Sequence, residues 1–429
     1  MAITLTPPPI LRQTVHLPAS KSISNRALLI DALCRHGHSE TGCKTDRLHN
    51  LSDCDDTRAM QQALTTATGS IDIGAAGTAM RFMTAYLAVT PGTRIITGSE
   101  RMQHRPIGVL VEALRQLGAH IEYVGQEGFP PLRITGMGSE EGSQDRLSVQ
   151  GDVSSQYISA LLMIGPVLAG GLTLRLAGRI VSRPYIEMTL SVMRAFGAKA
   201  EWTDKQTICV QPGGYCPTAY RIENDWSAAS YWYEMVALSK DEQAEVLLPG
   251  LYRQSLQGDS AVAEMFSPLG VLTEHTTDTE GHEAIRLTRG PRTDVQLHID
   301  FQHQPDLAQT FVVTSAMLGI PFHFTGLQSL KIKETDRILA LCTELHKLGY
   351  AVTDEGEGTL GWYGERCPEE EAPAIDTYED HRMAMAFAPA AMVRGRLCIR
   401  HPEVVSKSYP TFWEHLSAAG FGLAQNPDS

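Results

Sequence analysis

The chain has 429 residues, of which 43% are hydrophobic and 20% are charged, and its formal net charge is −13 at pH 7. This length allows two or three domains with ample cores, whereas the negative charge argues against a general nucleic-acid binder or a protein that binds anionic membranes. No apolar run reaches the length of a membrane span. The first ten residues do not resemble a signal peptide, so we expect a cytoplasmic globular protein.

The eight cysteines are scattered and form no C-x-x-C pair. This pattern indicates neither a zinc site nor a disulfide framework. We expect reduced thiols in a cytosolic protein.

The first motif in chain order is residues 17–30, where Lys21 and Arg26 lie among hydroxyl and amide side chains ahead of an apolar helix pattern. Ser22 or Ser24 can serve as the N-cap of this helix. A helix start with free N–H groups and two nearby cations favours a phosphate or a carboxylate. The alternative interpretation is an ordinary capped helix with solvated charges.

One kind of helix recurs along the chain, ends in Gly and is followed by alternating, strand-like residues. Its copies are residues 53–69, 105–118, 183–197, 259–270, 335–349 and 406–420, of which the first is the weakest. A second kind of helix alternates with it and is rich in Ala, Met and Leu, which is typical of buried helices. Its copies begin near Ser24, Gly77, Ser154, Asp225, Asp306 and Asp380.

These alternating helices predict six α/β units, arranged as two sets of three. The break falls near residues 221–225, and the first strand, near residues 3–5, could belong with the C-terminal half. The alternative is a generic α/β protein whose units look alike only because α/β units share a pattern.

Cations stand at or next to the predicted helix starts in both halves. They are Lys21, Arg26, Arg105, Lys333, Arg337, Arg382 and Lys407. Arg binds phosphate or carboxylate through a bidentate fork and Lys as a point charge, so the shared placement predicts a ligand with several negative charges. For any one of these residues, a solvated surface charge is the commoner case.

Two carboxylates, Asp306 and Glu334, lie in the same setting and could move protons, although Asp306 alone could be a helix cap. By contrast, we interpret Asp55, Asp56 and the three glutamates at 369–371 as solvated charges. His381 could be a core residue or a proton carrier.

These motifs resemble those of the 5-enolpyruvylshikimate-3-phosphate synthase family of enolpyruvyl transferases. The matching segments include LPASKSISNRALL from Leu17, GAAGTAMR from Gly74, KIKETDRI from Lys331 and EDHRMAMAFA from Glu379, and they follow the family's order from end to end.

The resemblance implies an α/β fold of two similar domains, each built from three βαβαββ repeats with buried helices in an inverse α/β barrel. The expected domains are residues 1–18 plus 224–429, on the phosphoenolpyruvate side, and residues 19–223, on the shikimate 3-phosphate side. The active site lies in the cleft between them. The implied reaction transfers the enolpyruvyl group of phosphoenolpyruvate to the 5-hydroxyl of 3-phosphoshikimate and releases phosphate. The family uses no metal or organic cofactor and is commonly monomeric.

The resemblance also implies roles for single residues. Asp306, Glu334 and Lys21 correspond to catalytic residues, with Asp306 as the proton acceptor at the 5-hydroxyl. The implied contacts to 3-phosphoshikimate are Lys21, Ser22, Arg26, Ser154, Ser155, Gln156, Ser182, Tyr185, Asp306 and Lys333. The implied contacts to phosphoenolpyruvate are Lys21, Gly77, Arg105, Gln156, Arg337, Arg382 and Lys407.

The chain departs from the family pattern at four positions. Ala75 stands where Asn is usual, Phe82 where Pro is common, Ala19 where Gly is common and Ser329 where Asn is frequent. Because Ala75 removes a side-chain donor, we expect it to weaken phosphoenolpyruvate binding relative to Asn.

Two other functions are alternatives to this reaction. A UDP-N-acetylglucosamine enolpyruvyl transferase would carry a Cys in the loop at residues 98–105, and this loop has none. A non-catalytic anion-binding protein on the same fold would be favoured by loss of Asp306, Glu334 or Lys21, and all three are present.

Overall fold

The computed structural model describes residues 1–36, 47–66, 69–137, 145–293 and 296–426. The chain divides into two compact units, which are described separately. Unit 1 comprises Met1–Pro18 and Glu223–Ser429, and unit 2 comprises Ala19–Ile222.

Unit 1 contains three four-stranded sheets among its described residues. They are built from β2 (Arg12–Thr14), β13 (Glu245–Pro249), β15 (Glu283–Arg289) and β14 (Val271–Thr277); from β16 (Leu297–Asp300), β17 (Phe322–Thr325), β19 (Thr359–Trp362) and β18 (Thr353–Gly356); and from β20 (Ala374–Ile375), β21 (Leu397–Arg400), β1 (Ala2–Thr6) and β22 (Gly422–Asn426).

Unit 2 contains two such sheets and a shorter one in the part of the chain that the structure describes. The four-stranded sheets are β4 (Gly69–Asp72), β5 (Thr93–Thr97), β7 (Leu132–Thr135) and β6 (His120–Tyr123), and β8 (Arg146–Gln150), β9 (Leu172–Ala177), β11 (Thr207–Val210) and β10 (Ala200–Trp202). The short sheet pairs β3 (Leu48–His49) with β12 (Tyr220–Arg221).

The five four-stranded sheets share one topology. In each, the first two strands are parallel, as in β4 with β5, and the other two pairings are antiparallel. A parallel pair needs a crossover connection, and a helix supplies it each time. The predicted α/β fold of repeated units is therefore confirmed. No pairing among the described residues joins one sheet to the next.

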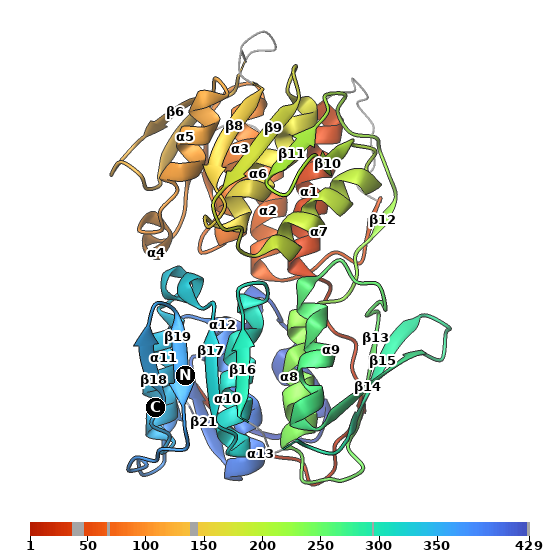
Figure 1. Ribbon diagram of the computed structural model, residues 1–429, viewed down its shortest axis with the longest axis vertical. Helices are drawn as coiled ribbons and strands as arrows, with labels where there is room; N and C mark the ends of the chain where they lie inside the picture. Colours follow the sequence, from red (N-terminus) through yellow and green to blue (C-terminus); the bar gives the residue numbers. More distant parts are fainter. Residues whose placement is uncertain (37–46, 67–68, 138–144, 294–295, 427–429) are drawn as a thin grey trace. The chain divides into compact units, whose positions relative to one another are not determined.

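One set of helices is buried. In unit 2 they are α1 (Lys21–His36), which precedes β3, and α3 (Gly77–Val89) and α6 (Ser155–Ile164), which connect parallel strands; in unit 1 they are α8 (Trp226–Leu238), α10 (Ala308–Leu318) and α12 (His381–Phe387), which also lie between parallel strands. In unit 1, α8 and α10 run alongside each other and are in contact (Figure 1). Because these helices are apolar on most sides, each unit has a core of helices covered by sheets.

A second set of helices lies nearer the surface. They are α2 (Asp55–Thr65), α5 (Gly108–Gln116), α7 (Arg183–Ala195), α9 (Val262–Met265) with the 3-10 turns η2 (Gly258–Ala261) and η3 (Ser267–Leu269), α11 (Arg337–Lys347) and α14 (Phe412–Ala418). Five of them are followed by a glycine with positive φ, at Gly118, Gly197, Gly270, Gly349 and Gly420. Glycine closes a helix in this conformation without the steric cost of a Cβ. This cap is the repeated sequence signal.

The first strand, β1, lies between β21 and β22 and is antiparallel to both. Ile3 is opposite Ile399 on one side and Gln425 on the other. The expectation that this strand belongs with the C-terminal half is confirmed. No helix in the described ranges is long and apolar enough to cross a membrane.

Candidate active site

Arg337 lies at the centre of a charged cluster in unit 1. Only 1% of its side chain is exposed, and its Nε lies 2.6 Å from Asp380 Oδ2. Its Nη2 donates to Glu334 Oε2 at 2.9 Å, and its Nη1 lies 3.4 Å from Asp306 Oδ1. Burial alone would lower the pKa of Arg337, but the three carboxylates raise it. Arg337 is therefore a permanently charged, fully engaged group.

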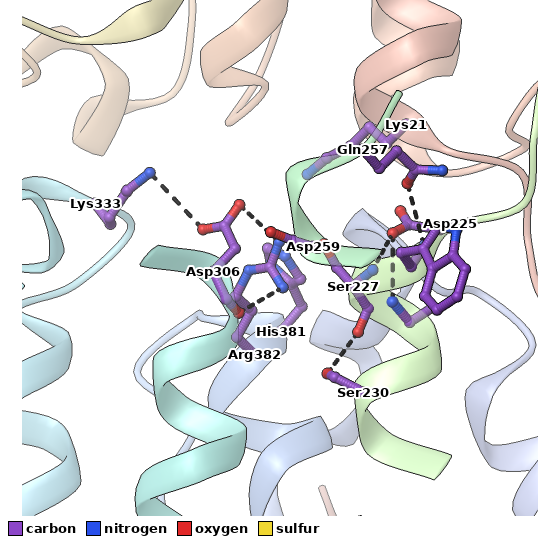
Figure 2. Close-up of polar contacts among 12 residues, drawn as sticks. Lys21, Asp225, Ser227, Ser230, Gln257, Asp259, Asp306, Lys333, His381 and Arg382 are labelled. Carbon is purple, nitrogen blue, oxygen red and sulfur yellow. Dashed lines mark hydrogen bonds and ion pairs between the residues drawn. The ribbon is translucent and has the colours of Figure 1, made fainter. Parts of the chain in front are cut away.

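Asp306 is held by two further cations. Arg382 Nη2 lies 2.9 Å from Asp306 Oδ2, and Arg382 Nη1 donates to the Asp306 backbone carbonyl at 3.2 Å. Lys333 Nζ lies 3.9 Å from Asp306 Oδ1 (Figure 2). About a fifth of the Asp306 side chain is exposed, so it combines a fixed position with access from outside.

Glu334 bridges Arg337 and Lys407. Its Oε1 lies 3.2 Å from Lys407 Nζ, while its other oxygen takes the Arg337 bond. We call the seven residues of these contacts the Arg337 cluster: Asp306, Lys333, Glu334, Arg337, Asp380, Arg382 and Lys407. Four cations face three carboxylates in it.

Local sequence explains how the cluster is positioned. Arg337 is the first residue of α11, and Asp336 caps that helix by accepting from the backbone N–H groups of Ile338 and Leu339, each at 3.1 Å. Arg382 is the second residue of α12, and Asp380 caps it by accepting the Arg382 N–H at 2.9 Å. Asp306 lies in the 3-10 turn η4 (Pro305–Leu307), just before α10.

Lys407 does not follow this pattern. It ends the 3-10 turn η7 (Pro402–Lys407), whereas the next helix, α14, begins at Phe412. The predicted helix start at this position is therefore wrong, although Lys407 does join the cluster. Pro410 lies between the two elements, and the residue before a proline is disfavoured in helical conformation.

Unit 2 carries a second group of predicted site residues, centred on Arg26. Its Nε donates to Thr189 Oγ1 at 2.7 Å and its Nη2 to Ser159 Oγ at 3.0 Å. Its Nη1 donates to the Ser22 carbonyl at 2.9 Å. The side chain is buried, and burial lowers its pKa to about 10. These partners are all neutral, and no carboxylate in the described part of the chain forms an ion pair with Arg26.

Lys21 is paired with an acid of the same unit. Its Nζ lies 3.2 Å from Asp56 Oδ2, and only 5% of the Asp56 side chain is exposed. The interpretation of Asp56 as a solvated charge is therefore wrong, while Asp55 is exposed as expected. The sequence does not predict this ion pair, because no neighbouring residue indicates which of the adjacent Asp55 and Asp56 side chains is buried.

The predicted N-cap at Ser22 or Ser24 is also wrong. Helix α1 already begins at Lys21, and the Ser20 hydroxyl accepts from the Ile23 N–H at 3.5 Å. Ser24 lies inside the helix, where its hydroxyl accepts from the Ser52 N–H at 3.0 Å. Because serines recur at alternate positions here, the cap pattern fits more than one register.

Gly77 and Arg105 are neighbours at the start of α3. A Cβ added at Gly77 would lie 2.6 Å from Arg105 Nη1, so the guanidinium lies directly against the glycine backbone. Gln156 Nε2 donates to Thr78 Oγ1 at 3.1 Å, which brings the start of α6 to the start of α3. Three of the predicted phosphoenolpyruvate contacts thus gather in one place.

The remaining predicted contacts lie at helix starts of unit 2. Ser154 caps α6 by accepting the Gln156 N–H at 3.3 Å, and Ser155 is the first residue of that helix. Ser182 precedes α7 with a left-handed backbone (φ 52°), and the Tyr185 carbonyl accepts from Arg26 at 3.4 Å. Helix starts of this kind offer N–H groups to an anion.

Asp380 is a cluster member that sequence reasoning took only as the start of a buried helix. Its side chain is fully buried and bonded to Arg337 and to the start of α12. The only available signal was its position directly before His381 and Arg382. His381 itself is buried, with Nδ1 3.8 Å from Asp380 Oδ1. The glutamates at 369–371 are exposed, as expected.

Among the described residues, no group of three or more His, Cys, Asp or Glu side chains is arranged to hold a metal ion. The seven cysteines within these ranges are free thiols. Cys43 lies outside the described residues.

Solved structures of enolpyruvyl transferases share this fold. The EPSP synthase of Acinetobacter baumannii aligns with a TM-score of 0.76 at 21% identity over 99% of this chain and 100% of that chain. The enolpyruvyl transferase NikO of Streptomyces tendae aligns with a TM-score of 0.71 at 15% identity, over 99% and 98%. The fold is thus that of an enolpyruvyl transferase.

Sequence comparison gives the particular family. The profile of EPSP synthase (3-phosphoshikimate 1-carboxyvinyltransferase) matches residues 65–416. The 3-phosphoshikimate 1-carboxyvinyltransferase of Bacteroides fragilis is 57% identical over 99% of both chains, and that of Vibrio cholerae is 36% identical over 96% of this chain and 98% of its own. This chain belongs to the EPSP synthase family, and the resemblance read from its motifs is confirmed.

Proposed function

We propose that this protein transfers the enolpyruvyl group of phosphoenolpyruvate to the 5-hydroxyl of 3-phosphoshikimate, giving 5-enolpyruvylshikimate 3-phosphate and phosphate in the shikimate pathway. Full-length identity of 57% to a relative named for this activity supports the reaction. The observation that carries the site assignment is the Arg337 cluster, where two partly exposed carboxylates are held by four cations.

The two substrates explain the charge of both groups. Each substrate carries a phosphate and a carboxylate, which Arg and Lys bind well. We assign phosphoenolpyruvate to Arg337, Arg382 and Lys407, together with Lys21, Gly77, Arg105 and Gln156. We assign 3-phosphoshikimate to Ser22, Arg26, Ser154, Ser155, Ser182 and Tyr185, together with Lys21, Gln156, Asp306 and Lys333.

The reaction needs two proton transfers in its first step. Attack of the 5-hydroxyl oxygen on C2 of phosphoenolpyruvate forms a C–O bond, releases the hydroxyl proton and requires a proton at C3. Asp306 is assigned as the acceptor of the hydroxyl proton and Glu334 as the group that exchanges the proton at C3. Each such step contributes about 10²–10⁴-fold to rate. Loss of phosphate from the adduct then returns the C3 proton to Glu334.

The test is phosphate release by the purified protein with phosphoenolpyruvate, with and without 3-phosphoshikimate. Release that depends on 3-phosphoshikimate and is lost in Asp306→Ala and Glu334→Ala supports both function and site. A matched control is Glu355→Ala, since Glu355 lies in β18 away from these contacts. Release only with UDP-N-acetylglucosamine would instead assign the sister activity, and binding of both substrates without release would indicate an anion-binding protein.

We also propose that the enzyme is a monomer in the cytoplasm. The family resemblance supports the monomer, and the absence of a membrane-spanning helix in the described ranges agrees with a cytoplasmic enzyme. Light scattering coupled to gel filtration, and cell fractionation with an antibody, test the two statements.

A further inference from the structure

Asp259 is a buried carboxylate that the assignments above do not use. It lies in η2 (Gly258–Ala261), which directly follows Gln257. Gln257 Nε2 donates to Glu223 Oε2 at 2.9 Å and to the Asn224 carbonyl at 2.8 Å. Its Oε1 accepts from the Trp226 N–H at 3.1 Å. These three hydrogen bonds fix Gln257, and we infer that they restrict the movement of Asp259, two residues further along the chain.

The Asp259 side chain is only partly satisfied. It is 3% exposed, and its Oδ2 accepts from the Ser227 hydroxyl. Its Oδ1 is buried and has no hydrogen-bond partner in the described part of the chain. A buried carboxylate with an unsatisfied oxygen is costly when ionised, and less so when protonated.

Charged groups face Asp259 from three neighbouring elements. They are Asp306 of η4, Arg382 of α12 and Asp225, the N-cap of α8 (Figure 2). Glu264 of α9 is exposed. Burial raises the pKa of Asp259 to about 7, and the charge of Asp306 raises it too. The Ser227 hydrogen bond and the charge of Arg382 act in the opposite direction.

We propose that Asp259 is a positioning residue for Arg382. While the Asp259 carboxyl is protonated, the Arg382 guanidinium remains available to Asp306 and to phosphoenolpyruvate. Once ionised, Asp259 becomes a second anion that attracts Arg382 and repels both Asp306 and the anionic substrate. Binding of phosphoenolpyruvate therefore weakens as pH rises through neutrality. This inference rests on the assignment of Arg382 to phosphoenolpyruvate in the proposed function.

The test compares the wild type with Asp259→Asn and Ser227→Ala. The KM for phosphoenolpyruvate and kcat are measured by phosphate release between pH 5.5 and pH 9. In the wild type, KM rises several-fold on the alkaline side while kcat changes less. In Asp259→Asn, this rise is absent, because the amide keeps the shape of the carboxyl but cannot ionise. Ionisation of the substrate itself affects all variants equally.

Ser227→Ala gives a second, directional outcome. Removing the hydroxyl takes away a hydrogen bond that favours the ionised form of Asp259, so its pKa goes up and the rise in KM moves to higher pH. The matched control Glu264→Gln, on the exposed side of the same segment, keeps the wild-type profile. If Asp259→Asn does not fold, Ser227→Ala alone decides the question.

A second test does not depend on activity, because proton binding to Asp259 is coupled to the free energy of unfolding. The native state binds a proton at Asp259 between about pH 4 and pH 7 that the unfolded chain has released. The free energy of unfolding of the wild type relative to Asp259→Asn therefore falls over this range and is level above it. An active enzyme whose KM profile is the same in the wild type and in Asp259→Asn would overturn the positioning role. No phosphate release by the wild type at any pH would contradict the proposed function instead.

Discussion

Arg337 touches three carboxylates with a side chain that is 1% exposed, so it stabilises the fold in addition to the phosphoenolpyruvate contact that we propose for it. Removing one member of a buried ion network leaves the others uncompensated and costs about 3–5 kcal/mol of stability. Loss of activity in an Arg337 variant would therefore mix unfolding with lost binding. Arg382, with its side chain 8% exposed and bonded mainly to Asp306, gives a cleaner test.

We predict that Arg382→Lys lowers kcat/KM for phosphoenolpyruvate by about 10- to 100-fold, mainly through KM. Lysine keeps the charge but not the forked geometry, and a hydrogen bond to a charged group is worth roughly 1.5–3 kcal/mol. Steady-state phosphate release measures this effect. The control Arg394→Lys changes an arginine paired with Glu369 and should leave kcat/KM unaltered. An unchanged KM in Arg382→Lys would remove Arg382 from the phosphoenolpyruvate site.

We predict that Gly77→Ala raises the KM for phosphoenolpyruvate several-fold. The added Cβ would lie 2.6 Å from Arg105 Nη1, so the guanidinium must move. The control is Gly125→Ala, where the nearest atom is 3.7 Å from the added Cβ and no change is expected. Equal KM values for Gly77→Ala and the wild type would show that the position of Arg105 does not matter for this substrate.

Sequence alone could supply much of the site at this scale, because the family motifs specify residue types along the chain. It could not supply the ion pairs of Asp56 and Asp380, since these depend on which elements meet in three dimensions. The expected effect of Ala75 on phosphoenolpyruvate binding stays a prediction. Ala75 is exposed beside Gly77 in the loop before α3, and the comparison of Ala75→Asn with the wild type in KM would test it.

At the scale of elements, the starts of helices organise the Arg337 cluster. Asp336 and Asp380 cap α11 and α12, and each cap lies directly before the helix that carries a cluster arginine. The capping carboxylates satisfy N–H groups that a helix cannot pair internally. The residues that start these two helices therefore also position the arginines of the Arg337 cluster.

We predict that Asp336→Ala lowers the free energy of unfolding by about 1 kcal/mol, the usual cost of a lost N-cap, and also reduces activity by misplacing Arg337. Asp336→Ser, which keeps a capping oxygen, should restore most of both. Urea denaturation and phosphate release measure the two effects. If Asp336→Ser were as inactive as Asp336→Ala while fully folded, the carboxylate itself would have a role in the reaction.

The repeated helices could be predicted because their signals are local: an apolar pattern and a terminal glycine. The order of strands within each sheet could not, since a strand of four residues contains no information about its partner. The N-cap of α1 cannot be predicted from the sequence for a related reason. Ser20, Ser22 and Ser24 offer similar hydroxyls, and only the structure shows that the helix begins at Lys21, directly after Ser20.

At the scale of the whole molecule, stability responds to a second buried acid. Glu234 lies in the middle of α8 with no exposed surface, and burial raises its pKa well above the usual value. Its raised pKa means that the folded protein keeps this carboxyl protonated over a pH range in which the unfolded chain releases the proton. The contribution of Glu234 therefore lowers the free energy of unfolding progressively as pH rises above about 4.5.

We predict that Glu234→Gln is more stable than the wild type at pH 8, and that this advantage shrinks as pH falls toward 4.5. The amide needs no proton to stay neutral, whereas the wild type must retain one. Chemical denaturation of both proteins between pH 4.5 and pH 8 measures the difference. A constant difference across this range would mean that Glu234 is already ionised in the folded protein.

The pairing of β1 with β21 and β22 has a consequence for synthesis on the ribosome. Unit 2 is a continuous segment, so all of its strands have been made once Ile222 has emerged. The strand Ala2–Thr6, by contrast, precedes that segment and acquires its hydrogen-bonding neighbours only when residues 397–426 have been translated. During most of translation the nascent chain therefore exposes an apolar strand with unpaired edges, and this interval is when it most needs a chaperone.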